Sequence, residues 1–294
     1  MRLKFDHIET FMMVVRYGGI RKASERIHLS QPAVTARIQG LEDALGVSLF
    51  DRQSKGMQLT KRGEILLRYA QQHVQLRNTI ELEVADPATI DLHLRLGVSE
   101  TIVQAWLPDF VSAFRGAYPK ATVEITVDIS VNLRQSLLDR SLDLAFLMGP
   151  VSDYSVKNVT LPEFPLGWFA SPNVDLSADP AALFAAHPVV TYARHTRPYR
   201  EMRTQLFQRY GAQAALFPSS SLSAIFRMVS SGLGVSAVPK TLAEPEIQAG
   251  RLRAFDPGWQ PEALAFTASY LDDADNGIAA RAAQIASTVA TTFR

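Results

Sequence analysis

Residues 20–62, IRKASERIHLSQPAVTARIQGLEDALGVSLFDRQSKGMQLTKR, decide how the first part of this chain folds. Two short helical patterns lie in this stretch, and only residues 28–31 separate them. Ser30 is a good N-cap for the second pattern, because its hydroxyl can accept a hydrogen bond from an unpaired N–H of the first turn. Pro32 falls in that first turn, where its missing N–H costs little. Gly46 then ends the predicted helix, as a left-handed C-terminal residue does.

The second helical pattern has two distinct faces. Its apolar residues recur at the spacing of a buried stripe: Val34, Ile38, Leu41 and Leu45. Another face carries short or amide side chains that can approach base edges: Gln31, Pro32, Thr35, Ala36 and Gln39. Glutamine can bond adenine at N6 and N7, and a threonine methyl can contact a thymine methyl.

A basic hairpin pattern follows the second helix. Val47–Phe50 and Met57–Thr60 are strand-like, and Arg52 and Lys55 flank the turn between them. A basic hairpin tip suits contact with the DNA backbone or the minor groove. The order of helix, helix and hairpin predicts a winged helix-turn-helix, which places its second helix in the DNA major groove.

Residues 23–63, ASERIHLSQPAVTARIQGLEDALGVSLFDRQSKGMQLTKRG, resemble the DNA-binding domain of LysR-type transcriptional regulators in order and without gaps. Members of that family often carry Arg at the position of Ala36, where it contacts DNA. The nearest arginine here is Arg37, one step round the helix, and we expect it to serve the phosphates instead. We expect the DNA contacts to come from Arg21, Ser30, Gln31, Pro32, Thr35, Arg37, Arg52 and Lys55. The alternative for the basic residues is an ordinary solvated face.

Charge is distributed unevenly along the chain. Residues 1–62 contain 11 Lys/Arg and 6 Asp/Glu and carry a formal charge of +5, whereas the whole chain carries +1. A basic first part on a slightly acidic body suggests that only the first part faces a polyanion, although chance would also give such a difference. Cysteine is absent, which excludes disulfides, thiolate metal sites and the thiol-based peroxide sensing known in one branch of the resembled family.

The start of the chain and its hydropathy bear on location. MRLKFDHIET contains acidic residues and no uninterrupted apolar core, so it does not resemble a secretory signal. No apolar run approaches the roughly 18–20 residues that span a bilayer. We therefore expect a cytoplasmic protein that does not engage membranes.

Residues 61–85 predict one long helix with an apolar seam at heptad spacing. The seam consists of Leu66, Tyr69, His73, Leu76 and Ile80. In LysR-type regulators the equivalent linker helix pairs with that of a second subunit, so the resemblance implies a homodimer or homotetramer. The alternative is that the seam packs on its own chain.

Residues 91–294 alternate between strand and helix patterns, which predicts an α/β domain with parallel sheets. We expect strands at 93–98, 123–129, 142–148, 166–170, 188–192, 232–239 and 265–271, and helices at 99–114, 133–138, 200–210, 221–230 and 278–293. Three stretches, LRLGVSETI, LDLAFL and MVSSGLGVSAVP, resemble the family's effector-binding domain, which is similar to two-lobed periplasmic solute-binding proteins.

The resemblance extends over essentially the whole chain and implies its domain boundaries. We expect a winged helix-turn-helix over 1–60, a linker helix over 61–90 and an effector domain over 91–294. Lobe I would comprise 91–162 and 268–294, and lobe II 163–267. Crossing strands would lie near 162–169 and 266–271.

Ligands of open α/β sheets bind at the carboxyl ends of strands. Ser99, Glu100 and Thr101 follow the first strand, and Ser130 follows the second. Helix N-termini at these points favour a carboxylate or phosphate, which suggests a small organic anion. In the resembled family, the positions of Ser99, Thr101 and Ser130 commonly bind effectors. We expect these hydroxyls also to cap their helices, and capping alone is the alternative.

The remaining effector candidates come from other strand ends. Gly149 ends the third strand and would shape the cleft floor, while Arg194 and Thr196 follow the strand VVTY. Arg194 or Arg197 would hold a carboxylate, although most surface arginines have no such role. Glu100 complicates this prediction, because it opposes an anion, pairs with a cationic group or simply points outward.

Two other classes of protein fit the sequence less well. An enzyme has little support, because there is no GxSxG, HExxH or Gly-rich phosphate loop, and the histidines lack ligand spacing. A cytoplasmic small-molecule-binding protein would leave the DNA module unexplained. The sequence therefore predicts a regulator that binds promoter DNA and responds to a small molecule, with no cofactor and no metal.

Overall fold

The computed structural model describes residues 3–51, 57–84, 92–211, 214–272 and 276–293. The chain divides into two compact units, one formed essentially by residues 1–85 and the other by residues 86–272 and 278–294. The predicted tips Arg52 and Lys55 lie outside the described residues. The linker helix belongs to the first unit.

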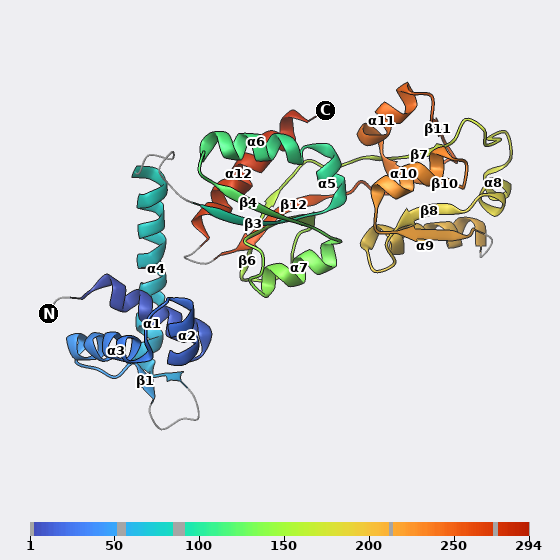
Figure 1. The fold of residues 1–294 in the computed structure, drawn as a ribbon. Coiled ribbons are helices and arrows are strands. Elements are labelled where there is room, and N and C mark those ends of the chain that lie inside the picture. The colour runs from blue at the N-terminus through green and yellow to red at the C-terminus, as the bar shows by residue number, and fades with distance from the viewer. Residues whose placement is uncertain (1–2, 52–56, 85–91, 212–213, 273–275, 294) are drawn as a thin grey trace. The chain divides into compact units, whose positions relative to one another are not determined.

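The first unit is a helical domain with a small hairpin (Figure 1). Its elements are α1 (Phe5–Tyr17), α2 (Ile20–Arg26), α3 (Gln31–Leu45), β1 (Phe50–Asp51), β2 (Gln58–Leu59) and α4 (Lys61–Val84). Val34, Ile38 and Leu41 of α3 are buried against α1, so the predicted apolar stripe forms the domain core. The hairpin strands are shorter than predicted, with Phe50 paired to Leu59.

The apolar seam predicted on α4 does not act as one surface. Leu66 and His73 turn toward their own domain, where the His73 ring stacks on Phe5 at 4.2 Å between ring centroids. Leu76 and Ile80 are 60% and 50% exposed. Part of the seam therefore packs within the chain, and part remains open.

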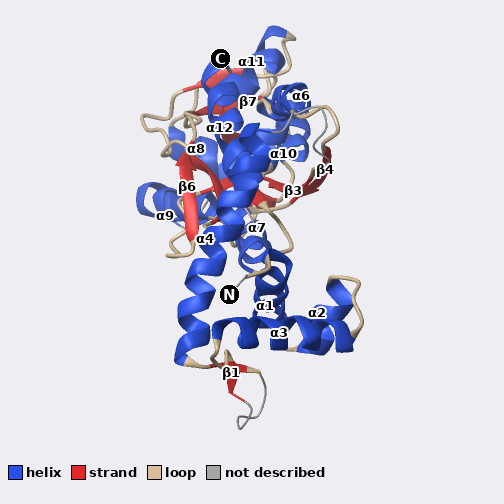
Figure 2. Ribbon diagram, turned by 90° about the vertical axis from the view of Figure 1, so that its left-hand side faces the viewer, coloured by secondary structure: helices blue, strands red, loops and turns tan. Residues whose placement is uncertain are grey.

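The second unit contains two sheets, which form two lobes (Figure 1). Figure 2 distinguishes its strands, in red, from its helices, in blue. Lobe I has the strand order β4-β3-β5-β12-β6. Its elements are β3 (His93–Val98), α5 (Glu100–Ala105), α6 (Leu107–Ala117), β4 (Thr122–Val127), α7 (Ser130–Leu138), β5 (Leu144–Met148), β6 (Val156–Thr160), β12 (Phe266–Leu271) and α12 (Gly277–Thr292). The core residues Phe110 and Phe146 meet edge to face at 5.0 Å between ring centroids.

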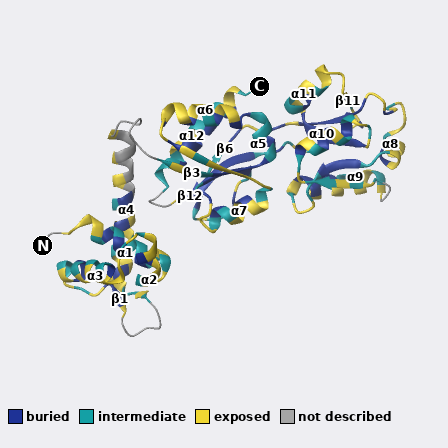
Figure 3. Ribbon diagram, viewed as in Figure 1, coloured by how far each residue is buried: buried dark blue, intermediate teal, exposed yellow. Residues whose placement is uncertain are grey.

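Lobe II has the strand order β11-β7-β10-β8-β9. Its elements are β7 (Leu166–Ala170), α8 (Pro180–Ala186), β8 (Val189–Tyr192), α9 (Arg197–Tyr210), β9 (Leu216–Ser219), α10 (Leu222–Ser230), β10 (Val235–Pro239), α11 (Lys240–Gln248) and β11 (Arg253–Phe255). Apolar residues of α8 and α9 pack on one side of the sheet, and those of α10 and α11 pack on the other. The central strands are accordingly buried (Figure 3).

The structure corrects several expectations for this unit. The helix predicted over 99–114 breaks at Trp106, because Pro108 cannot continue the first helix and lies instead in the first turn of a second one. The sheets are mixed, since β12 runs antiparallel to both its neighbours and β7 antiparallel to β10. Elements β6, α8, β9, α11 and β11 were not predicted.

The two crossing segments meet at an isolated antiparallel bridge between Phe164 and Leu264. Strand β12 pairs within the lobe I sheet from Phe266 onward, so it is not itself the crossing strand. The second crossing therefore lies a few residues earlier than predicted.

Candidate functional site

The exposed face of α3 is the candidate DNA-reading surface. Ser30 caps the helix, with its Oγ accepting from Ala33 N at 3.3 Å. Gln31 and Thr35 are exposed on the following turn, and Thr35 Oγ1 donates to the Gln31 carbonyl at 3.0 Å. Pro32, Ala36 and Gln39 are also exposed, so this face combines small side chains with the amide groups of Gln31 and Gln39.

The basic residues predicted to bind phosphates differ in how free their side chains are to contact DNA. Arg37 Nη1 donates to Thr10 Oγ1 at 3.2 Å, and Nη2 lies 3.6 Å from a carboxylate oxygen of Asp6. Its guanidinium is therefore turned toward α1. Arg21 is well exposed and pairs loosely with Glu25 one turn along its own helix, at 3.4 Å.

A buried carboxylate that the sequence analysis did not identify, that of Glu42, holds the segment leading into the hairpin. Glu42 is only 7% exposed, and its Oε1 accepts from the backbone N–H of Leu49 at 2.6 Å and of Phe50 at 3.4 Å. An acidic residue beside an apolar stripe gives no signal of this role, because the interaction depends on the turn that follows Gly46.

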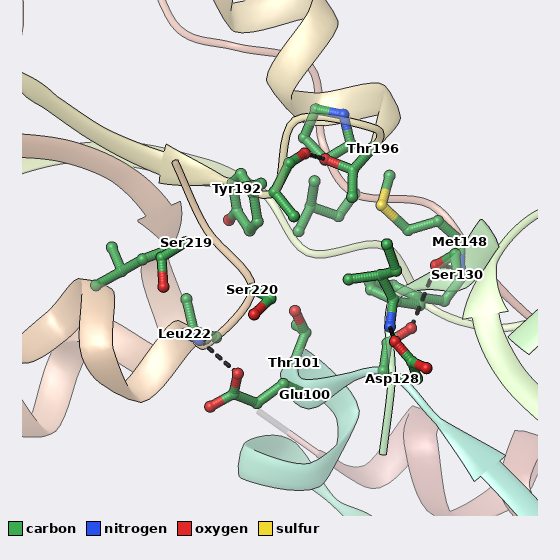
Figure 4. A pocket seen from close by; sticks show the side chains of 17 residues that line it. Glu100, Thr101, Asp128, Ser130, Met148, Tyr192, Thr196, Ser219, Ser220 and Leu222 are labelled. Atoms are coloured by element: carbon green, nitrogen blue, oxygen red, sulfur yellow. Dashed lines mark hydrogen bonds between the residues drawn. The ribbon is translucent and has the colours of Figure 1, made fainter. Parts of the chain in front are cut away.

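The second candidate site is a cavity between the lobes that opens to solvent (Figure 4). Lobe I and lobe II both supply its walls. The residues that line it are Ser99, Glu100, Thr101, Asp128, Ile129, Ser130, Met148, Tyr192, Ala193, Thr196, Pro198, Ser219, Ser220, Leu222, Ile225, Leu264 and Phe266. Five effector candidates predicted from the sequence, Ser99, Glu100, Thr101, Ser130 and Thr196, meet here.

Hydroxyl groups on the lobe I wall bond to one another and to a strand end. Ser99 is buried, and its Oγ lies 3.3 Å from Ser130 Oγ, which in turn accepts from Met148 N at 2.9 Å. Neither hydroxyl caps its helix, contrary to expectation. The reason is that the Ser99 hydroxyl bonds to Ser130, and the Ser130 hydroxyl turns to the end of β5 rather than to the helix amides.

Glu100 crosses from lobe I to lobe II. Its carboxylate accepts hydrogen bonds from the first turn of α10, including Ser223 N at 3.0 Å and Ser223 Oγ at 2.9 Å. Burial raises the pKa of this carboxyl, but the hydrogen bonds from Ser223, Leu222 and Ser221 outweigh burial and hold the pKa below its usual 4.5. Glu100 therefore remains ionised at neutral pH and does not point outward.

Tyr192 presents a different chemistry on the lobe II wall. Its hydroxyl oxygen is buried and has no hydrogen-bond partner among the described residues. Burial raises the pKa of this hydroxyl, so it stays protonated and is able to donate. Thr196, on the same wall, uses its hydroxyl to cap α9 and to donate to the Ala193 carbonyl at 2.6 Å.

The other predicted ligand contacts lie outside the cavity lining. Arg194 is exposed and does not line the cavity, and Arg197 pairs with Glu201 and Glu262. Gly149 lies against Thr267, where a Cβ would come within 2.0 Å of the threonine hydroxyl oxygen. The lining thus offers no cation for the organic anion that the sequence suggested.

The described residues show neither a metal site nor a membrane-spanning helix. No group of three or more His, Cys, Asp or Glu side chains is placed to hold a metal ion. No described helix has both the length and the apolar character needed to cross a membrane.

A helix-turn-helix domain joined to a two-lobed α/β domain with a central cavity defines a ligand-responsive DNA-binding regulator. The chain belongs to the LysR family: residues 5–64 match the bacterial regulatory helix-turn-helix protein model of the lysR family, and residues 89–284 match the LysR substrate binding domain. It is a transcriptional regulator with a DNA-binding and an effector-binding domain, not an enzyme.

Relatives and solved structures agree with this assignment. The chain is 29% identical over 241 residues to the HTH-type transcriptional regulator YofA of Bacillus subtilis, covering 81% of each chain. It is 28% identical over 261 residues to GltR of the same organism, covering 84% of this chain and 83% of GltR. Full-length LysG of Corynebacterium glutamicum with bound effector Arg shares the fold, with a TM-score of 0.64, 18% identity and 99% of each chain covered.

Proposed function

We propose that this chain is a cytoplasmic homo-oligomer that binds promoter DNA and changes its DNA binding when a small molecule occupies the cavity between the lobes. The observation that carries the proposal is a cavity walled by both lobes, since a ligand there contacts groups on each side. A ligand shifts a conformational equilibrium only by its differential affinity for the two arrangements. A cavity shared by two lobes provides such a difference.

The DNA contacts are proposed on α3 and the residues around it. Gln31, Thr35 and Pro32 present an exposed face that fits base edges, while Arg21, Arg52 and Lys55 serve the phosphates. Ser30 contributes through its cap, which fixes the start of the helix. Arg37 would reach phosphate only by leaving Asp6 and Thr10.

Oligomer formation is proposed through the open part of α4. Its exposed apolar side chains are Ile65, Tyr69, Leu76, Ile80 and Val84. A 24-residue helix with such a face buries it by pairing with a second copy.

The test is footprinting of the purified chain on the DNA flanking its own gene, at two salt concentrations and against an unrelated duplex. We expect protection of two half-sites spaced by whole helical turns. Equal, weak and strongly salt-dependent binding to both duplexes would contradict sequence-specific regulation from this region.

The same assay tests the cavity once a screen has found a compound that alters protection. Ser99→Phe should abolish the response and leave DNA binding intact, because the ring would fill space beside Ser130. Ser177→Phe, on an exposed loop of lobe II, is the control. A response that survives in Ser99→Phe would mean that the effector binds elsewhere.

A further inference from the structure

The carboxylate of Glu100 occupies the N-terminus of α10 as a bound anion would (Figure 4). Oε1 accepts from Ser223 N at 3.0 Å, from Ser223 Oγ at 2.9 Å and from Ser221 Oγ at 3.2 Å, and Oε2 accepts from Leu222 N. Gln104 Nε2 adds a further bond to Oε1 at 3.2 Å. Free N–H groups and the helix dipole make such a terminus the natural anion site of the lobe II wall, and here it is filled from within the chain.

No side chain elsewhere in the cavity supplies a positive charge in place of that site, although α5 and α7 begin at the cavity without side-chain caps. Among its lining residues, all within the described part of the chain, there is no Lys, Arg or His, and the only carboxylates are Glu100 and Asp128. An anionic ligand would therefore be desolvated beside two like charges, with no cationic side chain to pair with and with the α10 dipole already neutralised by Glu100.

Apart from Glu100 and Asp128, the polar side chains that line the cavity are uncharged. Tyr192 is one of the lining residues, but its hydroxyl is buried and has no partner among the described residues, so a ligand does not reach it. Serine and threonine hydroxyls on both walls supply uncharged contacts: Ser99, Thr101, Ser130, Ser219 and Ser220.

We propose that Glu100 is the charge-selectivity determinant of the cavity: it takes the place of a ligand's carboxylate or phosphate, and so restricts the effector to polar molecules without an anionic group. This inference rests on the proposed effector site. It assigns to Glu100 a role in choosing the ligand, in addition to joining the two lobes.

The test measures by calorimetry how tightly the full chain binds two anionic probes, inorganic phosphate and succinate. Glu100→Ser vacates the α10 terminus. It should bind phosphate at least about tenfold more tightly than the native chain does, because the helix amides become available. Asp128→Asn is the matched control, since it removes a charge from the same cavity but leaves Glu100 on α10; it should gain no such binding. Basic surfaces of the DNA-binding domain are common to all three proteins and cancel in the comparison.

A second variant guards against misfolding of the first. Glu100→Gln retains the size of the side chain and one acceptor oxygen, and it should bind phosphate only slightly better than the native chain. Phosphate or succinate binding in the native chain equal to that in Glu100→Ser would overturn the inference, as would an equal gain in Asp128→Asn. If Glu100→Ser gains anion binding but no cavity ligand ever alters the DNA footprint, the selectivity role stands and the proposed regulatory function fails.

Discussion

Glu42 shows how much of a small domain can depend on one buried carboxylate. We expect Glu42→Ala to destabilise the first unit by about 2 kcal/mol or more, because the backbone N–H groups of Leu49 and Phe50 would remain buried without an acceptor. Asp43→Ala is the control, since this exposed neighbour on the same helix should have a far smaller effect.

The tryptophans allow this prediction to be localised. All three lie in the second unit: Trp106, Trp168 and Trp259. Urea unfolding of Glu42→Ala should therefore show an earlier transition by circular dichroism and an unchanged transition by tryptophan fluorescence. A shift in the fluorescence transition would mean that Glu42 does not act locally.

Gln31 is the residue with which base reading is best tested. Gln31→Ala should weaken binding to the footprinted site by about 1–3 kcal/mol, because an amide bonded to a base edge carries sequence information. Binding to random DNA should change little. Arg21→Ala should instead weaken both and reduce the salt dependence, because Arg21 is an exposed residue proposed to contact phosphate. Equal losses on both duplexes for Gln31→Ala would assign it to the backbone.

Among the elements, the start of α4 is held closely against the hairpin. A Cβ at Gly63 would lie 2.2 Å from the Leu49 carbonyl oxygen, whereas one at Gly116 in α6 would meet nothing within 4 Å. Gly63→Ala should lower the free energy of unfolding of the first unit by about 1–3 kcal/mol, as measured by circular dichroism. Gly116→Ala should raise the free energy of unfolding of the second unit by about 0.5–1 kcal/mol, as measured by tryptophan fluorescence. Equal effects would contradict this difference in packing.

The contact of α5 with α10 should respond to acid. Because the hydrogen bonds of Glu100 lower its folded-state pKa below 4.5, this carboxylate contributes stability above the unfolded value and loses it as pH falls through the folded value. Thermal melts by fluorescence should show the native chain more stable than Glu100→Gln at neutral pH. The difference should vanish in the acid range below 4.5. A difference independent of pH would assign the effect to packing.

At the scale of the whole molecule, the open face of α4 predicts the state of association. Leu76→Glu combined with Ile80→Glu should convert an oligomer to a smaller species in sedimentation velocity, because both side chains are at least half exposed in the single chain. Gln72→Glu places a charge on an exposed position of the same helix and serves as the control. An unchanged sedimentation coefficient in the double variant would place the interface elsewhere.

Periodicity and local punctuation predicted the helix-turn-helix almost to the residue. Ser30 and Gly46 mark α3 because capping is decided by neighbours in the sequence. The effector domain was harder, since its strands depend on partners far along the chain. Among the described strands, β6 pairs only with β12, which lies more than a hundred residues later in the chain. No local sequence pattern predicts this strand.

The candidate site was predicted only in part, because some of its contacts also join residues far apart in the chain. Ser99, Thr101 and Ser130 follow strands, so their position at the cavity was readable from the order of elements. The partner of Glu100 was not, because α10 lies in the other lobe. The anion prediction followed from the helix N-termini at Ser99 and Ser130, whereas the N-terminus that Glu100 occupies is that of α10 in the other lobe.

The central place of β12 in the lobe I sheet also has a consequence for folding during translation. Strands β5 and β6 are joined through β12, which is made after all of lobe II. During translation, lobe II can complete its sheet while lobe I waits with the edge of β5 unpaired, and such an edge invites association with other chains. Nascent chains stalled before residue 266 should therefore be more prone to aggregate and to bind chaperones than chains stalled after β12 has emerged.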